Sequence, residues 1–373
     1  MDFELSDDQQ SLQKAAADLL GALSSPPRVR AAMSNDGGLD RELWEAMAEQ
    51  GWMGIEAEER RGGLGLGAVD AAVLCEQLGR HAAPVPYVPL LVARRALADA
   101  AETGSTLAEH WAGVLADGRG IACTAWAAEP AGILAARGAA GWSLTGSPGP
   151  VDAAPDADVC VVAATVAEGP AAGRRAVFAV PMDEALRPRP EPSMDRTRSL
   201  GWLTFDRTPA ERIGDSHNAD LLLDRGATLV SAQLLGGADR VLEMAVEYAK
   251  VRTQFGRPIG SFQAVKHRCA DMLVDVEGMR SAAYYAAWCV GEAIPDASLA
   301  ASSAKVWCSE ASRRVCASGL QVHGGIGFTW DHDLHIYMKR SQLDEWSYGT
   351  AAYHLDRVAA MLRARIEAGD PVL

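Results

Sequence analysis

Residues 321–350 read QVHGGIGFTWDHDLHIYMKRSQLDEWSYGT, and this stretch decides which fold and which kind of site to expect. Three glycines, Gly324, Gly325 and Gly327, stand within four positions directly after a helical run. Glycine tolerates positive φ and lets another molecule approach the backbone closely, so such a turn suits a phosphate group or a tight crossing of chain segments. The stretch ends in Tyr348-Gly349-Thr350 at the head of another helical pattern.

The composition of the chain limits its class. At 373 residues it can bury large cores, and two or three domains are expected. With 35 basic and 49 acidic residues and a net charge of −14, it shows no basic footprint for DNA or RNA. No apolar run of about 18 residues predicts a membrane span, and the acidic N-terminus MDFELSDDQQ is the reverse of a secretory signal. Seven scattered cysteines, never spaced CxxC, favour free thiols in a cytoplasmic protein.

The chain divides into three segments by its residue pattern. Residues 1–119 read as helical, with a helix start at Ser6 and a stop at Gly51. Residues 120–217 carry short β-type runs between Gly and Pro clusters, which predict a small β domain. These runs are Ile121–Trp126, Gly141–Leu144, Val159–Ala164, Ala176–Val180 and Leu200–Phe205. Residues 218–373 read as helical again.

Two patterns that suggest other chemistry are set aside. The glycine-dense run 62–67 neither follows a predicted strand nor lies in a βαβ unit, so it does not indicate dinucleotide binding. His332 and His335 have no further ligand at a sensible spacing, so no metal site is expected.

A second motif, residues 248–263, reads YAKVRTQFGRPIGSFQ. Together with the glycine stretch it resembles the acyl-CoA dehydrogenases closely, and the likeness covers essentially the whole chain. The resemblance implies an α+β multidomain fold with an N-terminal helical domain, a central β-barrel and a C-terminal four-helix bundle. It also implies α,β-dehydrogenation of a CoA thioester, in which a carboxylate removes the α-proton and FAD takes the β-hydrogen as hydride.

The catalytic base of the family is missing at both of its usual places. By resemblance, the glutamate position falls on Tyr348, and the alternative position on the preceding long helix falls on Gly226. A phenol with a pKa of about 10 is a poor base for this step. Glu345, three residues before Tyr348, is an alternative base if the alignment slips by one helical turn, and Asp224 is a weaker one.

The motifs that hold the flavin ring in the family are also altered. In residues 128–134, AEPAGIL, Ala128 replaces a threonine and the Ser-Asp end of the motif is gone. Further on, Pro150 replaces the tryptophan that packs on the ring, and Asp152 replaces the threonine that bonds to it. Thr350 is kept, but Ala352 replaces a glutamine. The carboxylate of Asp152 would repel the flavin edge or its phosphates.

The positions that contact the ADP end of FAD are intact by contrast. In this family they belong to the neighbouring subunit of a dimer. Arg252 matches the arginine that reaches the pyrophosphate, where a guanidinium makes short charge-assisted bonds. The full set of expected cofactor-binding residues is Arg252, Gln254, Phe255, Gln263, Gln321, Gly324 and Gly325. Gln254 departs from the family, which has a threonine there.

This asymmetry predicts the non-catalytic half of a heteromeric (α2β2) acyl-CoA dehydrogenase, with FAD shared with a catalytic subunit. Paired-subunit enzymes of actinobacterial steroid side-chain degradation look similar, so a steroid side-chain CoA thioester is the expected substrate. Electron-transfer flavoprotein is the acceptor implied by resemblance. Two alternatives stay open: a homotetrameric dehydrogenase with an unusual base such as Glu345, and a flavin-free scaffold or CoA-thioester binding protein.

Overall fold

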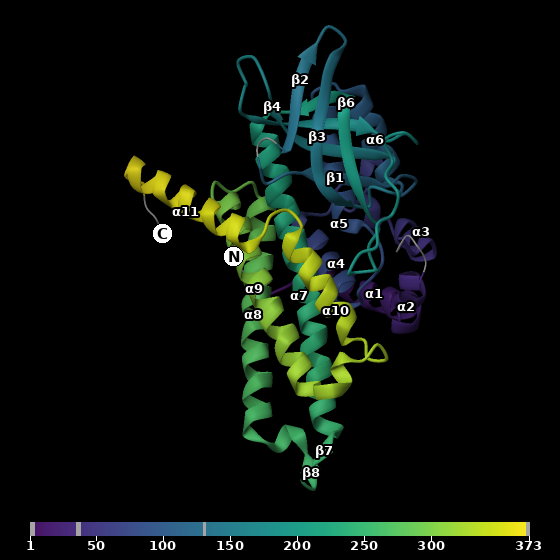
Figure 1. The fold of residues 1–373 in the computed structure, drawn as a ribbon, viewed down its shortest axis with the longest axis vertical. Coiled ribbons are helices and arrows are strands. Elements are labelled where there is room, and N and C mark those ends of the chain that lie inside the picture. The colour runs from purple at the N-terminus through teal and green to yellow at the C-terminus, as the bar shows by residue number, and fades with distance from the viewer. Residues whose placement is uncertain (1–3, 35–38, 130–131, 371–373) are drawn as a thin grey trace. The chain divides into compact units, whose positions relative to one another are not determined.

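A computed structural model describes residues 4–34, 39–129 and 132–370. Its internal contacts group the chain into two compact units. The bundle unit consists of residues 1–27, 68–83 and 227–373, and the barrel unit consists of residues 28–67 and 84–226. In chain order, helices precede the strands and helices follow them, which confirms the predicted fold class (Figure 1). The boundaries drawn from the sequence at 119/120 and 217/218 stay a prediction.

The barrel unit is built on six strands. They are β1 (Ala122–Trp126), β2 (Ile133–Gly138), β3 (Gly141–Asp152), β4 (Val159–Val166), β5 (Arg175–Pro181) and β6 (Leu200–Gly214). The order β4-β2-β3-β6-β5 closes on itself because β5 also pairs with β4, and β1 runs parallel to β4. Every residue of β4 is buried, which fits its continuous apolar sequence. Strand β2 was not expected from the sequence.

Helices complete the barrel unit. They are the latter part of α2 (Pro26–Ser34), α3 (Arg41–Glu49), η1 (Trp52–Gly54), η2 (Glu59–Arg61), α5 (Tyr87–Glu102) and α6 (Thr106–Ala116). Gly51 has φ +73° directly after α3, which confirms the predicted stop. The indole N–H of Trp44 donates to the Gly118 carbonyl at 2.9 Å, so α3 is tied to the end of α6.

The bundle unit holds the remaining helices. They are α1 (Asp7–Leu23), α4 (Ala68–Arg80), most of α7 (Ser216–Val251), η4 (Ile259–Ser261), α8 (Gln263–Gly291), α9 (Ala297–His323), η5 (Gly324–Phe328), α10 (Leu334–Trp346) and α11 (Ala351–Ala368). Figure 1 shows α7, α8, α9 and α10 running along one another. Ser6 forms a capping box with Gln9, which confirms the predicted helix start. Among the described helices, none has the length and apolar character needed to cross a bilayer.

Two glycines let helices α4 and α7 touch through their backbones. A Cβ on Gly79 would lie 2.0 Å from the Gln233 carbonyl oxygen, and one on Gly236 would lie 1.8 Å from the Glu76 carbonyl oxygen. Neither distance is possible for a real side chain. Glycine at these two positions therefore lets α4 and α7 cross at a short distance within the bundle.

Candidate functional site

A short hairpin joins α7 to α8 at one end of the bundle unit (Figure 1). Its strands, β7 (Thr253–Gln254) and β8 (Arg257–Pro258), are linked by Phe255 and Gly256, which have φ +54° and +78°. Two positive φ values in a two-residue loop are typical of a type I′ turn. A bulky residue at positive φ is strained. Phe255 is nevertheless 91% exposed, so the hairpin holds an aromatic ring out in the solvent.

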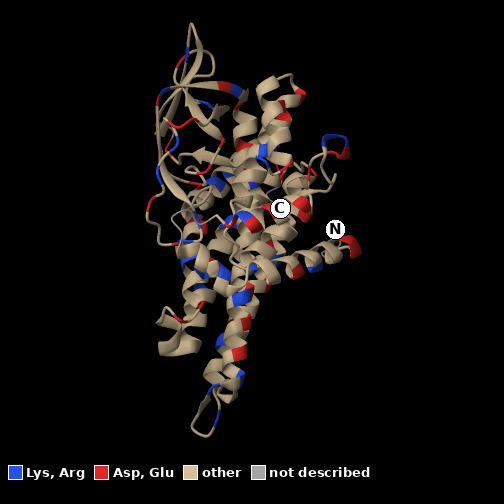
Figure 2. Cartoon of the chain, turned by 90° about the vertical axis from the view of Figure 1, so that its right-hand side faces the viewer, with Lys and Arg blue, Asp and Glu red and all other residues tan. Residues whose placement is uncertain are grey.

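Arg252 and its neighbours present polar donors at this end. The Arg252 backbone is fixed, because its N–H donates to the Tyr248 carbonyl at 2.9 Å and its carbonyl accepts from Ile259 at 2.8 Å. Its side chain is exposed, as are those of Gln254 and Gln263. In a chain of net charge −14, residues 248–270 contain no Asp or Glu, and the ribbon at the hairpin end is coloured blue at Lys and Arg positions in Figure 2. Their basic residues are Lys250, Arg252, Arg257, Lys266 and Arg268.

The glycine run forms an open cradle at the end of α9. Gly324 has φ +62° and ψ −142°, a conformation that only glycine adopts readily. A Cβ built on Gly324 or on Gly325 would meet no atom within 4 Å, so another molecule has room to approach this backbone. Gln321 is exposed on the last turn of α9.

An aromatic stack brings the two sequence motifs together. The ring of Tyr248, at the start of one motif, stacks on the ring of His323 just before the glycine run, with centroids 4.8 Å apart and planes 24° apart. An exposed guanidinium, amide side chains and an open glycine backbone therefore belong to one end of the bundle unit. This set fits an anionic, phosphate-bearing ligand such as the ADP end of FAD.

Tyr348 lies in the turn between α10 and α11, with φ +53°. Hydrogen bonds donated to its backbone carbonyls fix the conformation of this turn. The Lys305 ammonium, fully buried, donates to the carbonyls of Glu345 and Gly349, both at 2.8 Å, and to the Ser309 hydroxyl at 3.3 Å. His354 Nε2 lies 2.8 Å from the Tyr348 carbonyl oxygen.

Lys305 and His354, the two buried groups that bond to this turn, both have lowered pKa values. Burial lowers the pKa of Lys305 to about 8 and that of His354 to about 4. At neutral pH, His354 is therefore neutral and its Nε2 donates to Tyr348, while Nδ1 accepts from the Ser302 hydroxyl at 3.1 Å. These hydrogen bonds fix the turn, and the side chain at the position expected for the base is the phenol of Tyr348.

The other candidate bases are engaged elsewhere. The Glu345 carboxylate, 15% exposed, lies 3.5 Å from an Arg313 side-chain nitrogen on α9. Asp224 is 1% exposed within α7, and Gly226 is buried. Neither position predicted for the catalytic glutamate carries a carboxylate.

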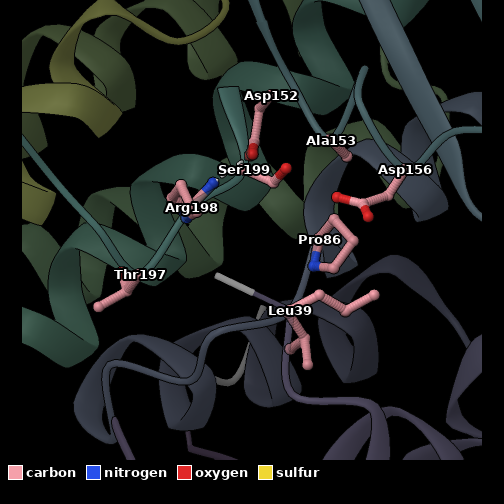
Figure 3. Close-up of a pocket in the computed structure, with 9 residues that line it drawn as sticks. Leu39, Pro86, Asp152, Ala153, Asp156, Thr197, Arg198 and Ser199 are labelled. Carbon is pink, nitrogen blue, oxygen red and sulfur yellow. Dashed lines mark hydrogen bonds and ion pairs between the residues drawn. The ribbon is translucent and has the colours of Figure 1, made fainter. Parts of the chain in front are cut away.

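One of the residues expected around a flavin ring, Asp152, lies in a closed polar cluster of the barrel unit, called here the Asp152 cluster. Asp152, at the end of β3, makes an ion pair with Arg198, whose side chain is only 5% exposed (Figure 3). The adjoining cavity measures about 10 Å³, room for one water at most. Ala128 and Glu129 are exposed before β2. Pro130 and Ala131 of the same motif lie outside the described residues.

This cluster does not fit a flavin ring. The carboxylate at position 152 is satisfied by a cation from its own chain, and the cavity beside it is far smaller than a ring system. The sequence motifs did not reveal Arg198, which stands 46 positions from Asp152. The available signal was the carboxylate itself, because a mostly buried Asp requires a cation or several donors.

No metal site emerges from the described part of the chain, where no three His, Cys, Asp or Glu side chains gather. His335 instead packs edge-on against Trp330, with centroids 4.6 Å apart, and His332 packs against His323 at 4.5 Å.

The chain matches two family models, "Acyl-CoA dehydrogenase, N-terminal domain" over residues 6–106 and "Acyl-CoA dehydrogenase, C-terminal domain" over residues 218–362. It is 35% identical to acyl-CoA dehydrogenase IpdE2 of Mycobacterium tuberculosis, over 90% of this chain and 91% of that protein. The chain belongs to the acyl-CoA dehydrogenase family. Acyl-CoA dehydrogenase FadE27 of the same organism is 31% identical, over 97% of this chain and 99% of its own length.

Solved acyl-CoA dehydrogenase structures agree with the fold. A structure of the ChsE4–ChsE5 complex from Mycobacterium tuberculosis matches with a TM-score of 0.89 and 32% identity, covering 97% of this chain and 99% of that one. A Tcur3481–Tcur3483 steroid acyl-CoA dehydrogenase variant matches with the same TM-score, 31% identity and the same coverage. The family binds FAD, and the residues at the hairpin end fit its ADP portion.

Proposed function

We propose that this chain is the non-catalytic subunit of a heteromeric acyl-CoA dehydrogenase. The observation that carries the proposal is the asymmetry between two half-sites. The residues for the ADP end of FAD are exposed and open, whereas Asp152, expected at the flavin ring, pairs with Arg198 of the same chain beside a cavity of about 10 Å³.

The role of the chain is to complete a partner's FAD site. Arg252 binds the pyrophosphate, and the Gly324–Gly325 backbone accommodates the cofactor closely, because no side chain fills that space. Phe255 leaves solvent by packing on the adenosine, and Gln254, Gln263 and Gln321 supply amide contacts. FAD, when bound, supplies the hydride chemistry, and the catalytic partner supplies the base that Tyr348 does not.

The relatives support a paired assembly and a steroid substrate class. One similar structure is that of a complex of two different proteins, and another is named a steroid acyl-CoA dehydrogenase. We infer an α2β2 assembly, a CoA thioester of a steroid-derived acyl group as the substrate, and electron-transfer flavoprotein as the electron acceptor.

The test is to co-purify the chain with a catalytic acyl-CoA dehydrogenase subunit and measure bound flavin per chain. One FAD per heterodimer is expected, with none on the isolated chain. Arg252→Ala should lower FAD affinity by about ten- to a hundredfold, since a charge-assisted bond to phosphate contributes about 1.5–3 kcal/mol. Arg257→Ala, at a neighbouring exposed position that stacks on Phe262, is the matched control and should leave affinity within about twofold.

Two outcomes would favour the alternatives. Stoichiometric FAD and dehydrogenase turnover by the purified chain, abolished by Glu345→Gln, would establish a homomeric enzyme with an unusual base. Absence of flavin from every complex the chain forms would point to a scaffold or CoA-thioester binding protein.

A further inference from the structure

Three arginines of the barrel unit are almost fully buried, and they differ in their partners. Arg198 makes an ion pair with Asp152, and Arg225 makes one with Glu56, whose side chain is itself 5% exposed. Arg94, in the middle of α5, is 2% exposed and has no ion pair among the described residues. The same unit thus supplies a carboxylate to two buried guanidinium groups and none to the third.

The unpartnered atoms of Arg94 have a specific geometry. Its Nε and Nη2 are both buried and make no hydrogen bond in the described structure. In a planar guanidinium these two N–H groups point to the same side, parallel to one another. That arrangement is the fork which binds the two oxygens of a carboxylate.

The surroundings of Arg94 offer no substitute for such an anion. Tyr87, seven residues earlier on the same helix face, donates its hydroxyl to the Trp52 carbonyl at 2.8 Å. Leu90 and Leu97, one turn to either side of Arg94, are fully buried and apolar. The nearest carboxylate on the helix, Asp99, is held by Arg95 at 2.9 Å.

A buried guanidinium without an anion is costly. Burial lowers the pKa of Arg94 to about 10, so the group still carries its charge at neutral pH. An uncompensated buried charge and two unmade hydrogen bonds oppose folding, and a chain that keeps them gains stability when an external oxyanion arrives.

We propose that the Nε–Nη2 fork of Arg94 is a receptor for the carboxylate of a small organic ligand, either a free organic acid or the far end of an acyl-CoA thioester. The first turn of α5 follows Val85 and Pro86, which line the cavity of Figure 3. Arg94 lies about 12 Å further along the helix at 1.5 Å per residue. The site belongs to the barrel unit and does not depend on the sharing of FAD.

The first test uses the purified full-length chain and acetate, with chloride at equal ionic strength as the reference. Acetate should raise the thermal unfolding midpoint of the wild type. The rise should vanish in Arg94→Gln and in Arg94→Lys, which keeps the charge but loses the fork. It should persist in Arg95→Gln, the adjacent exposed arginine. No acetate effect in the wild type, or an equal effect in the Arg94 variants, would overturn the proposal.

Calorimetry then identifies the source of the carboxylate. Adipoyl-CoA and hexanoyl-CoA differ only in a terminal carboxylate, and adipate supplies that group without CoA. Tighter binding of adipoyl-CoA than of hexanoyl-CoA by about tenfold or more, lost in Arg94→Lys, would assign the thioester. Equal binding of adipate and adipoyl-CoA, again lost in Arg94→Lys, would assign a free acid.

A stability measurement separates a binding role from a packing role. Without ligand, Arg94→Met should raise the unfolding midpoint, because it removes an unpaired buried charge while keeping much of the side-chain volume. A lowered midpoint in Arg94→Met would show that the arginine is already satisfied within the fold, and would contradict the proposal.

Discussion

The hairpin end of the bundle unit leaves its charged side chains exposed, whereas the Asp152 cluster of the barrel unit pairs them with one another. At the hairpin end, Arg252 is exposed, and the backbone of Gly324 and Gly325 is open. In the cluster, Asp152 is bonded to Arg198 from the same chain, and the cavity is about 10 Å³. Polar groups that have no partner in their own chain are available to bind a ligand. Polar groups that pair with each other already have the partner that a ligand would supply. The proposed function rests on this difference, with one part of a cofactor site kept and another closed.

The largest effect is expected when one member of the Asp152 cluster is removed. Asp152→Ala leaves the Arg198 guanidinium buried without its carboxylate, so the free energy of unfolding should fall by about 3–5 kcal/mol. Urea unfolding of the full chain measures the loss. The double variant Asp152→Ala, Arg198→Met should recover much of it, since the unpaired charge is gone. A double variant no more stable than Asp152→Ala would show that the ion pair is not the reason for the loss.

The turn below Tyr348 is also internally paired, and it should respond to acid. The pKa of His354 is about 4 in the folded chain and about 6.5 in the unfolded chain. Between these values the unfolded chain binds more protons, so the free energy of unfolding should fall as pH falls from 6.5 to 4, by at most about 3 kcal/mol. Unfolding curves at several pH values measure this slope.

The control for the acid effect is a difference between variants. Burial also lowers the pKa of His81, so the wild-type slope has more than one source. His354→Gln should flatten the slope between pH 6.5 and 4, and His81→Gln should leave the His354 contribution in place. An unchanged slope in His354→Gln would contradict the assignment.

Two adjacent glycines of the run should respond differently to substitution. Gly324→Ala forces a side chain into a strained backbone conformation and should cost about 1–3 kcal/mol of stability. A Cβ at position 325 meets no atom within 4 Å, so Gly325→Val should leave stability within about 0.5 kcal/mol. In the complex, however, Gly325→Val should weaken FAD binding by about tenfold, because its side chain fills the open space. Unaltered FAD affinity would show that the cradle is not used.

The smallest effect is expected at Tyr348. Tyr348→Phe removes only a hydroxyl, so turnover of the complex should stay within experimental error. A fall in turnover of tenfold or more would give the phenol a part in catalysis and would end the description of this chain as non-catalytic.

Much of the fold follows from local signals in the sequence. The capping box at Ser6 and the positive φ of Gly51 appear where helix-boundary chemistry predicts them. Strand β2 was missed because only its first residues alternate, Ile133 and Ala135 being buried and the rest exposed. Its pairing with β3 and β4 determines its conformation, and such partners are not visible in a six-residue window.

The candidate site was predictable where it depends on motifs and not where it depends on long-range pairing. Tyr348 and the hairpin residues follow from two contiguous stretches. The partnership of Asp152 with Arg198 spans 46 residues. Arg94 and Arg95 are the same residue type side by side on one helix, yet only Arg94 is buried, and no local pattern separates a cation that faces solvent from one that faces the interior.

The buried ammonium of Lys305 has a consequence for how such a chain can change over time. It holds the α10–α11 turn through main-chain carbonyls, as does His354, and main-chain atoms are the same whatever residue occupies position 348. A substitution there changes what the turn presents while leaving intact the bonds that form it. Descendants of one ancestral protein can thus gain or lose a proton acceptor by a single amino-acid replacement while the turn keeps its conformation.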